Sequence, residues 1–220
     1  MPDYAQFWAP QSFEEAEFHI DTGHTGAAFW VWGRDMAALV EGYYPDEPVA
    51  TVVDYGCGVG RVLKCLKAER RIGIDVSPEM LALAKRYARG CEFIEGDGRS
   101  IPLADGEADM VYSVLVLQHM DAADAARIVS ETARVLRKGG RCFLQFSGFG
   151  EAWSPTATLP RSACTWTGSR DTSGHGARQA LAYTSDIVRF LGSVAGFAVV
   201  EVIAYEQNTK LPYYALVGTR

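Results

Sequence analysis

Short apolar runs alternate with amphipathic stretches through the middle of the chain, between residues 49 and 147. The apolar runs have the length of buried strands, and the stretches between them repeat their apolar positions every three or four residues. This alternation predicts βαβ units, and therefore a parallel sheet with helices on both faces. The predicted strands are residues 50–54, 71–75, 91–95, 108–113 and 140–146, and the predicted helices are residues 59–68, 78–89 and 122–137.

The two regions that flank this central part differ from it in composition and in their hydrophobic pattern. Residues 27–43 predict a helix within an aromatic-rich N-terminal region, and residues 184–195 predict another near the other end, followed by strands over 197–205 and 211–218. Residues 148–183 are polar and rich in Gly, Ser, Thr and Trp, which is typical of a functional loop or lid. We therefore expect one domain over residues 1–220, made of an N-terminal helical cap (1–48), a core (49–147), a substrate lid (148–183) and a C-terminal helix and strand pair (184–220).

The composition narrows the class of protein. With 220 residues, 48% of them hydrophobic, the chain can bury a sizeable core. Its net charge of −6 and its lack of a basic block argue against a nucleic-acid partner. No apolar stretch is long enough to cross a bilayer and the N-terminus does not resemble a signal peptide, so we expect no membrane partner and a cytoplasmic location. The five cysteines form no C-x-x-C pair, as expected of free thiols in a reducing compartment: Cys57, Cys65, Cys91, Cys142 and Cys164.

The first chemical signature follows the first predicted strand. Asp54 ends the strand, and glycine then stands at every second position, Gly56, Gly58 and Gly60. Glycines without Cβ atoms allow a sharp turn and a ligand lying against the backbone, and the predicted helix that follows would supply free N–H groups. The dinucleotide fingerprint has a different glycine spacing, and an acid at this point suits a sulfonium or ammonium group better than a pyrophosphate. An ordinary glycine-rich turn remains the alternative.

Two further acids follow the next two strands. Asp75 ends the second strand, where a carboxylate can accept hydrogen bonds from both hydroxyls of a ribose. Ser77 and Pro78 then predict the N-cap and first position of a helix. Asp97 follows the third strand beside Gly98, placed for an amino group on an adenine-like ring, although a turn residue explains Asp97 equally well.

Together these motifs resemble the class I S-adenosylmethionine-dependent methyltransferases. The residues that carry the resemblance are VDYGCGVG at 53–60, the acids Asp75 and Asp97, ADMVYSVLVLQH at 108–119 and VLRKGG at 135–140. The resemblance implies an α/β fold with a doubly wound, mostly parallel seven-stranded sheet whose last strand is antiparallel. It also implies S-adenosylmethionine as the cofactor and S-adenosylhomocysteine as its product. The cofactor-binding residues it implies, with Arg34 as a partner for the methionine carboxylate, are Arg34, Asp54, Tyr55, Gly56, Cys57, Gly58, Asp75, Val76, Asp97, Gly98, Arg99, Ser113, Val114 and Gln118.

The acceptor side of the site is less sharply defined by the sequence. His119 follows the fourth strand, next to the expected methyl group, and is the candidate general base; packing is the alternative. His19, His24 and Asp21 lack the spacing of a metal site, so we expect no metal. The candidate substrate-contacting residues are Trp30, Trp153, Trp166, His175 and Tyr213.

The sequence thus predicts an enzyme that methylates an oxygen or nitrogen of a small-molecule acceptor, as a monomer or homodimer. The alternatives are a protein or RNA methyltransferase, and a non-catalytic subunit that binds S-adenosylmethionine for regulation. A nicotinamide oxidoreductase is a fourth interpretation, and Asp54 together with the glycine spacing argues against it.

Overall fold

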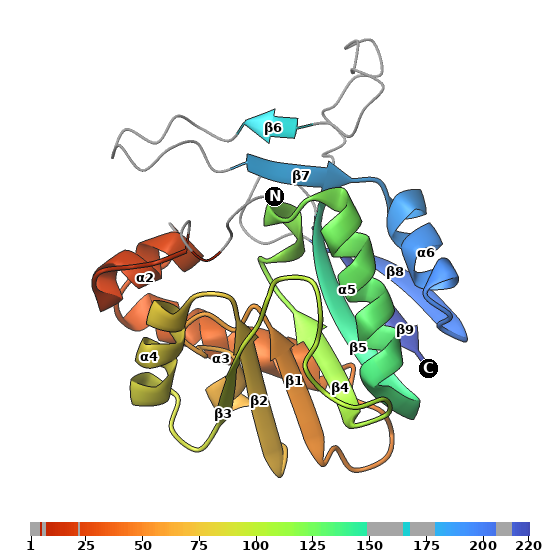
Figure 1. The fold of residues 1–220 in the computed structure, drawn as a ribbon, viewed down its shortest axis with the longest axis horizontal. Helices are drawn as coiled ribbons and strands as arrows, with labels where there is room; N and C mark the ends of the chain where they lie inside the picture. The colour runs from red at the N-terminus through yellow and green to blue at the C-terminus, as the bar shows by residue number, and fades with distance from the viewer. Residues whose placement is uncertain (1–4, 6–7, 22, 149–164, 168–178, 206–212) are drawn as a thin grey trace.

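The structure is a computed structural model that describes residues 5, 8–21, 23–148, 165–167, 179–205 and 213–220. A twisted sheet forms its centre, with helices on both faces (Figure 1). The strands are β1 (Thr51–Tyr55), β2 (Arg70–Asp75), β3 (Glu92–Glu95), β4 (Ala108–Ser113), β5 (Leu136–Gly148), β6 (Thr165–Thr167), β7 (Gln179–Tyr183), β8 (Val199–Tyr205) and β9 (Tyr213–Thr219). The helices are α2 (Phe13–Ile20), α3 (Ala27–Glu41), α4 (Pro78–Tyr87), α5 (Ala122–Val135) and α6 (Ser185–Val194), with short 3₁₀ turns η1 (Leu63–Cys65) and η2 (Leu117–His119).

The strand order confirms the predicted sheet. From one edge it runs β3-β2-β1-β4-β5, with each neighbouring pair parallel. β9 then lies antiparallel against β5, and β8 antiparallel against β9. The last strand of the chain is therefore the antiparallel one, as expected, and the carboxyl ends of the parallel strands meet at one edge of the sheet.

A short hairpin was not predicted. β7 pairs in parallel with the end of β5, at Ser147 and Gly148, and β6 pairs antiparallel with β7. Both strands lie in the region 148–183, whose polar composition predicts a loop rather than strands. β6 has three residues and β7 has five, which is too short for a periodic signal within a polar region.

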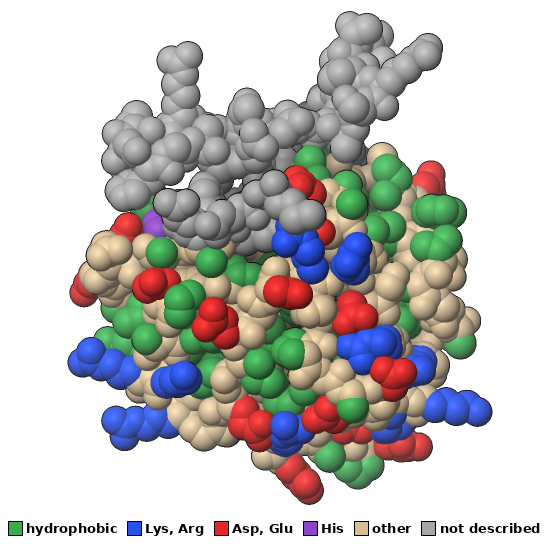
Figure 2. Space-filling view, viewed as in Figure 1, with side chains coloured by type: hydrophobic (Ala, Val, Ile, Leu, Met, Phe, Trp, Pro, Cys, Tyr) green, Lys and Arg blue, Asp and Glu red, His purple; other side chains and the backbone are tan. Residues whose placement is uncertain are grey.

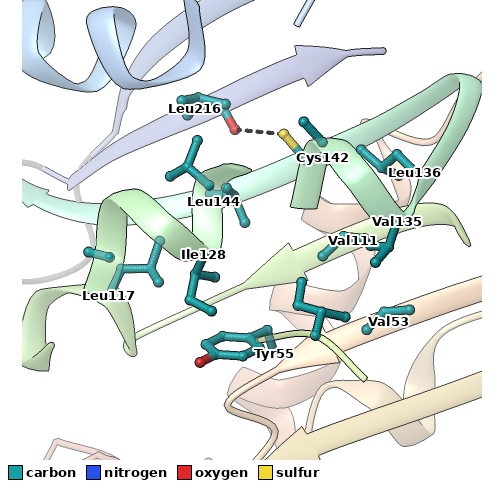
Figure 3. Close-up of a cluster of buried hydrophobic side chains, with 14 of the residues drawn as sticks. Val53, Tyr55, Val111, Leu117, Ile128, Val135, Leu136, Cys142, Leu144 and Leu216 are labelled. Carbon is teal, nitrogen blue, oxygen red and sulfur yellow. Dashed lines mark hydrogen bonds between the residues drawn. The ribbon is translucent and has the colours of Figure 1, made fainter. Parts of the chain in front are cut away.

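The central strands β1 and β4 are buried along almost their whole length, as expected where helices cover both faces of a sheet. One face carries Val53, Val111 and Leu144 and packs against Ile128 of α5, in the cluster shown in Figure 3. The opposite face packs against α3, whose Met36, Ala37 and Val40 share a second cluster with strand residues. Full burial of side chains of this size stabilises the fold by about 1.5–3 kcal/mol each.

The start of α4 forms as its sequence predicts. Ser77 is the N-cap, and its side chain accepts a hydrogen bond from the backbone N–H of Met80, while Pro78 occupies the first helical turn. Pro78 loses nothing there because the first N–H groups of a helix have no partner inside it.

The helix predicted over residues 59–68 is wrong, because only η1 forms in this segment. Gly60 has a φ of +72°, which a right-handed helix excludes, and Leu66 is already extended before β2 begins at Arg70. Too few residues remain between these two points for a helix and a return to the sheet. The turn after β1 is therefore followed by tight turns, and not by the helix N-terminus that we expected to supply N–H groups.

Gly60 gives a test of this turn. A Cβ at Gly60 would lie 2.8 Å from the Cβ of Ala88, in addition to its positive φ. We expect Gly60→Ala to lower the free energy of unfolding by about 2–4 kcal/mol, since it adds overpacking to the steric cost of the left-handed conformation. Gly196→Ala is the matched control, because Gly196 has a φ of +89° and open space around it. It should cost only about 1–2 kcal/mol. Urea denaturation measures both, and equal losses would contradict the proposed contact.

Candidate functional site

A cavity lies at the carboxyl ends of β1, β2 and β4. It encloses about 100 Å³, several times the space that one water molecule needs. The segments that follow these three strands form its floor and walls, and α2 with the residues before it forms one side. The described residues that line it are Trp8, His19, Ile20, Tyr55, Gly56, Gly58, Ile74, Asp75, Val76, Met80, Gly96, Gly98, Val114, Leu115, Val116, His119 and Met120.

The glycine turn after β1 forms the floor of the cavity. Gly56 and Gly58 have φ angles of +79° and +52°, in the left-handed region that glycine adopts at little cost. A Cβ on Gly56 would lie 2.3 Å from a methyl carbon of Val116, and one on Gly58 would lie 2.9 Å from Ile20. Both positions thus require glycine, because of the backbone conformation and because Val116 and Ile20 leave no space for a Cβ.

Asp75 joins the end of β2 to this turn. Its carboxylate accepts hydrogen bonds from the backbone N–H groups of Gly58, at 2.8 Å, and Ser77, at 3.0 Å. Burial raises the pKa of Asp75, and these N–H groups act in the opposite direction by stabilising its charged form. Because Asp75 also lines the cavity, it presents a hydrogen-bond acceptor to a ligand that lies on the turn.

Asp54 lies beneath the turn and is not among the cavity-lining residues. It is buried, and its carboxylate accepts a 2.6 Å hydrogen bond from the hydroxyl of Tyr112. Burial raises the pKa of Asp54 from 3.8 to about 7, which the bond from Tyr112 opposes and the nearby charge of Asp75 reinforces. The structure thus places Asp54 in the core, where it joins β1 to Tyr112 of β4.

The loop after β3 contributes backbone to the cavity. Gly96 and Gly98 line it, whereas the side chain of Asp97 is exposed. One carboxylate oxygen of Asp97 accepts hydrogen bonds from the backbone N–H groups of Arg99 and Ser100 and from the Ser100 hydroxyl. Although desolvation acts the other way, these bonds lower the pKa of Asp97. Its second oxygen takes part in none of these three bonds.

His119, at the end of η2, also lines the cavity. Its Nε2 lies 3.3 Å from Nε2 of Gln118, and because an amide nitrogen can only donate, the imidazole Nε2 accepts in this contact. Oε1 of Gln118 accepts a 2.9 Å hydrogen bond from the hydroxyl of Ser147, near the end of β5. Gln118 thus lies behind His119 and links it to the sheet.

The sequence analysis missed the residues that cover the cavity from the N-terminal side. Trp8, His19 and Ile20 all line it, and the indole of Trp8 contacts both imidazoles, with ring centroids 6.2 Å from His19 and 5.3 Å from His119. A usable signal for α2 was present: Ser12 followed three residues later by Glu15 is a helix-start pattern, and Ser12 does accept a hydrogen bond from the Glu15 N–H. No local feature of the sequence indicates that one side of α2 faces a ligand site.

Arg61 joins this N-terminal region to the glycine turn. Its guanidinium lies between the rings of Phe29 and Trp32, at 4.4 and 3.8 Å from their centroids, and donates to Asp21 at 3.2 Å. Burial lowers the pKa of Arg61 to about 10 and Asp21 opposes the shift, so Arg61 stays charged at neutral pH. Asp21 directly follows His19 and Ile20, so this ion pair holds the cavity-lining end of α2 in place.

The structure brings about half of the predicted site residues to the cavity: Tyr55, Gly56, Gly58, Asp75, Val76, Gly98, Val114 and His119. Several others lie outside its lining. Arg34 is exposed on α3, Cys57 is buried against Gly73, the Ser113 hydroxyl donates to the carbonyl of Tyr55, and Arg99 pairs with Asp124 of α5.

The predicted substrate residues fall elsewhere or outside the described part of the chain. Trp30 stacks on Phe13 and lies under Lys64, away from the cavity lining, and Tyr213 begins β9. Trp153, His175 and the side chain of Trp166 are outside the described residues, so their predicted roles stay predictions. Within the described ranges, no group of three or more His, Cys, Asp or Glu side chains is arranged to hold a metal ion.

The shape and chemistry of the cavity define the ligand it can accept. Asp75 offers a carboxylate to hydroxyl groups, and Ile74, Val76 and Met80 beside it supply an apolar surface suited to a flat ring. The glycine turn admits a slim polar chain against its backbone. The imidazole of His119 faces the same space, where a second molecule would be able to react with the first.

Comparison with known proteins supports this picture. The family described as "Methyltransferase domain" matches residues 53–144, which span β1 to β5. A solved structure of the PH0226 protein from Pyrococcus horikoshii OT3 superposes with a TM-score of 0.67 at 17% identity, covering 92% of this chain and 98% of that one. The two proteins therefore share a fold.

Several named relatives are similar to this chain in sequence. A probable tRNA methyltransferase 9B from Mus musculus is 31% identical over 139 residues, 61% of this chain and 31% of that protein. A malonyl-[acyl-carrier protein] O-methyltransferase from Methylococcus capsulatus is 35% identical over 112 residues, 48% of this chain and 39% of that relative. The chain thus spans well under half the length of these two.

A protein of the same name from Dechloromonas aromatica is 32% identical over 209 residues, 93% of this chain and 70% of that protein. A match of that extent spans the glycine turn and the strand-end acids. The chain therefore belongs to the class I S-adenosylmethionine-dependent methyltransferases.

Proposed function

We propose that this protein transfers the methyl group of S-adenosylmethionine to an oxygen or nitrogen of a small-molecule acceptor. The observation that carries the proposal is that one cavity is lined by the glycine turn and Asp75 as well as by His119 and Trp8. Relatives named malonyl-[acyl-carrier protein] O-methyltransferase favour oxygen as the acceptor atom.

The donor side of the cavity fits this cofactor. Asp75 would accept hydrogen bonds from the ribose hydroxyls, the glycine turn would hold the amino-acid portion, and Gly96 and Gly98 would lie beside the adenine. When bound, S-adenosylmethionine supplies an already activated methyl group on its sulfonium sulfur. The contribution of the chain is then to orient the acceptor and exclude water, and orientation can lower the barrier by about 7–11 kcal/mol.

His119 is proposed to take the proton from the acceptor group. The ordinary pKa of an imidazole lies near neutral pH. The Gln118 amide donates to Nε2 and orients the ring, so proton transfer to His119 requires the acceptor group to replace Gln118 at this nitrogen. Trp8 packs edge-on against the same imidazole, 5.3 Å between ring centroids, and closes that end of the cavity.

Two other interpretations remain as alternatives. The tRNA methyltransferase relative supports a nucleic-acid acceptor, whereas the net charge of −6 and the mixture of acidic and basic side chains on the face in Figure 2 favour a small molecule. A non-catalytic subunit would bind the cofactor without turnover. No helix among the described residues is both long and apolar enough to cross a bilayer. We propose a cytoplasmic location, with the chain acting as a monomer or homodimer.

The proposal is tested in two steps with the full chain. Calorimetry with S-adenosylmethionine and S-adenosylhomocysteine tests the donor site, and absence of binding would contradict the proposed function. Release of S-adenosylhomocysteine is then measured with a malonyl thioester as the first acceptor, followed by small hydroxyl and amine compounds and by tRNA. Turnover with tRNA alone would replace the small-molecule proposal.

Asp75→Ala should weaken S-adenosylhomocysteine binding by about 1.5–3 kcal/mol, roughly 10- to 150-fold, because charge-assisted hydrogen bonds to the ribose are lost. Calorimetry gives the change. Asp97→Ala is the comparison variant, since its exposed carboxylate already accepts three hydrogen bonds within its own turn and should matter less. Unchanged affinity in Asp75→Ala would remove Asp75 from the site.

His119→Ala should reduce turnover by about 10²–10⁴-fold and leave cofactor affinity nearly unchanged, as expected for the loss of a general base. Turnover is measured by S-adenosylhomocysteine release and affinity by calorimetry on the same preparation. Normal turnover would show that His119 only shapes the cavity wall.

Asp54→Asn tests whether burial raises the pKa of Asp54. The folded-state pKa of about 7 lies above the ordinary 3.8, so the folded chain holds this proton while the unfolded chain releases it, and the wild type loses stability as the pH rises from about 4 to 7. Asparagine does not titrate. The variant should therefore gain about 2–4 kcal/mol relative to wild type between pH 4 and pH 8. Urea denaturation across this range measures the difference, and a constant difference would contradict the raised pKa.

A further inference from the structure

Leu115 has an unusual backbone conformation at the wall of the cavity. Its φ is +63°, and no other non-glycine residue in the described ranges has a positive φ. The left-handed conformation costs a residue with a Cβ about 1–2 kcal/mol, and leucine has no polar side-chain atom to offset it. Leu115 lines the cavity together with its neighbours Val114 and Val116.

A buried glutamine holds this conformation. Gln145 of β5 is 0% exposed, and its Oε1 accepts a 2.6 Å hydrogen bond from the backbone N–H of Leu115. β4 and β5 pair up to Ser113 and Leu144, so Gln145 stands one position beyond the last pair. The side chain of Gln145 thus bonds to the backbone just beyond the end of β4, where backbone pairing between β4 and β5 has stopped.

The amide of Gln145 is itself costly to bury. Its Nε2 has no hydrogen-bond partner among the described residues. A buried unsatisfied N–H group costs about 1–3 kcal/mol, which an apolar side chain of the same size would avoid. Two unfavourable features therefore lie side by side at the cavity, and such features cluster where function requires them.

The conformation of Leu115 sets the position of the residue after it. Val116 lies over the glycine turn so closely that a Cβ on Gly56 would lie 2.3 Å from its methyl carbon. The segment from Val114 to Val116 lines the cavity and connects this contact to η2, which carries His119. If Leu115 relaxed to a negative φ, this segment would change direction at the point where donor and acceptor meet.

We propose that Gln145 is a positioning residue of the methyl-transfer site, which acts through the left-handed Leu115 to set the wall between donor and acceptor. The role of this wall in methyl transfer rests on the proposed function, whereas the hydrogen bond between Gln145 and Leu115 does not. The competing explanation is that Gln145 only fills space in the core between β5 and its neighbours.

The experiment combines two substitutions in the full chain. Gln145→Met removes the acceptor oxygen while nearly keeping the volume, and it also removes the unsatisfied N–H. Leu115→Asn keeps the branched shape and suits the left-handed conformation, which asparagine tolerates well. All four combinations are measured for hydrogen–deuterium exchange of the Leu115 amide and for S-adenosylhomocysteine affinity by calorimetry. Leu144→Met, a volume-conserving change next to Gln145 on the other face of β5, is the control.

With leucine at position 115, Gln145→Met should speed exchange of this amide by at least about tenfold and raise the Kd for S-adenosylhomocysteine about 3- to 10-fold, the size of one lost hydrogen bond. With Leu115→Asn as background, the same change should alter the Kd less than about twofold, because the left-handed conformation no longer needs support. Leu144→Met should change neither quantity.

Two results would overturn the proposal. One is an unchanged exchange rate and affinity in Gln145→Met, and the other is an equal loss of affinity with either residue at position 115, which indicates general loosening of the core. Failure of the wild type to bind S-adenosylhomocysteine would instead contradict the proposed function, since exchange at Leu115 would still report on Gln145.

Discussion

The hydrogen bond between the carboxylate of Asp75 and the N–H of Gly58 is the contact on which the rest of the site depends. It joins the end of β2 to the turn after β1 at 2.8 Å and fixes a backbone that only glycine adopts at low cost. Ile20 and Val116 then press on the turn from opposite sides. Asp75 therefore both faces the ligand and fixes the glycine turn on which the ligand lies. A change at Asp75 affects ligand binding and the local backbone together.

The features that the sequence predicts are those that local chemistry determines. Buried parallel strands, the capped start of α4 and the glycine turn each follow from a few consecutive residues, and all are present. The ends of parallel strands meet at one edge, so strand-end residues such as Asp75 and His119 could be assigned to one site without knowing the structure. The helix expected over residues 59–68 does not form, because Gly60 adopts a left-handed backbone conformation that a right-handed helix excludes.

The contacts that sequence reasoning missed join residues far apart in the chain. Trp8 and His19 reach the cavity only because the N-terminal region folds back over it, and Arg61 holds that region through Asp21. Gln145 meets Leu115 across thirty positions. No local pattern in the sequence marks these residues as partners of one another. Asp54 and Arg34 show the opposite limitation, because a residue can match a motif position and still lie outside the cavity lining.

The pairing of β7 with the end of β5 has an evolutionary consequence. Ser147 pairs with Ala182 and Gly148 with Tyr183, while Phe146 and Tyr183 pack ring to ring at 5.0 Å, so the two ends of the intervening segment are held together on the sheet. An insertion closed at its base in this way can change in length or sequence without moving the strands beneath it. The segment between these two pairs can thus diverge during evolution while the strands that carry the glycine turn and Asp75 keep their positions.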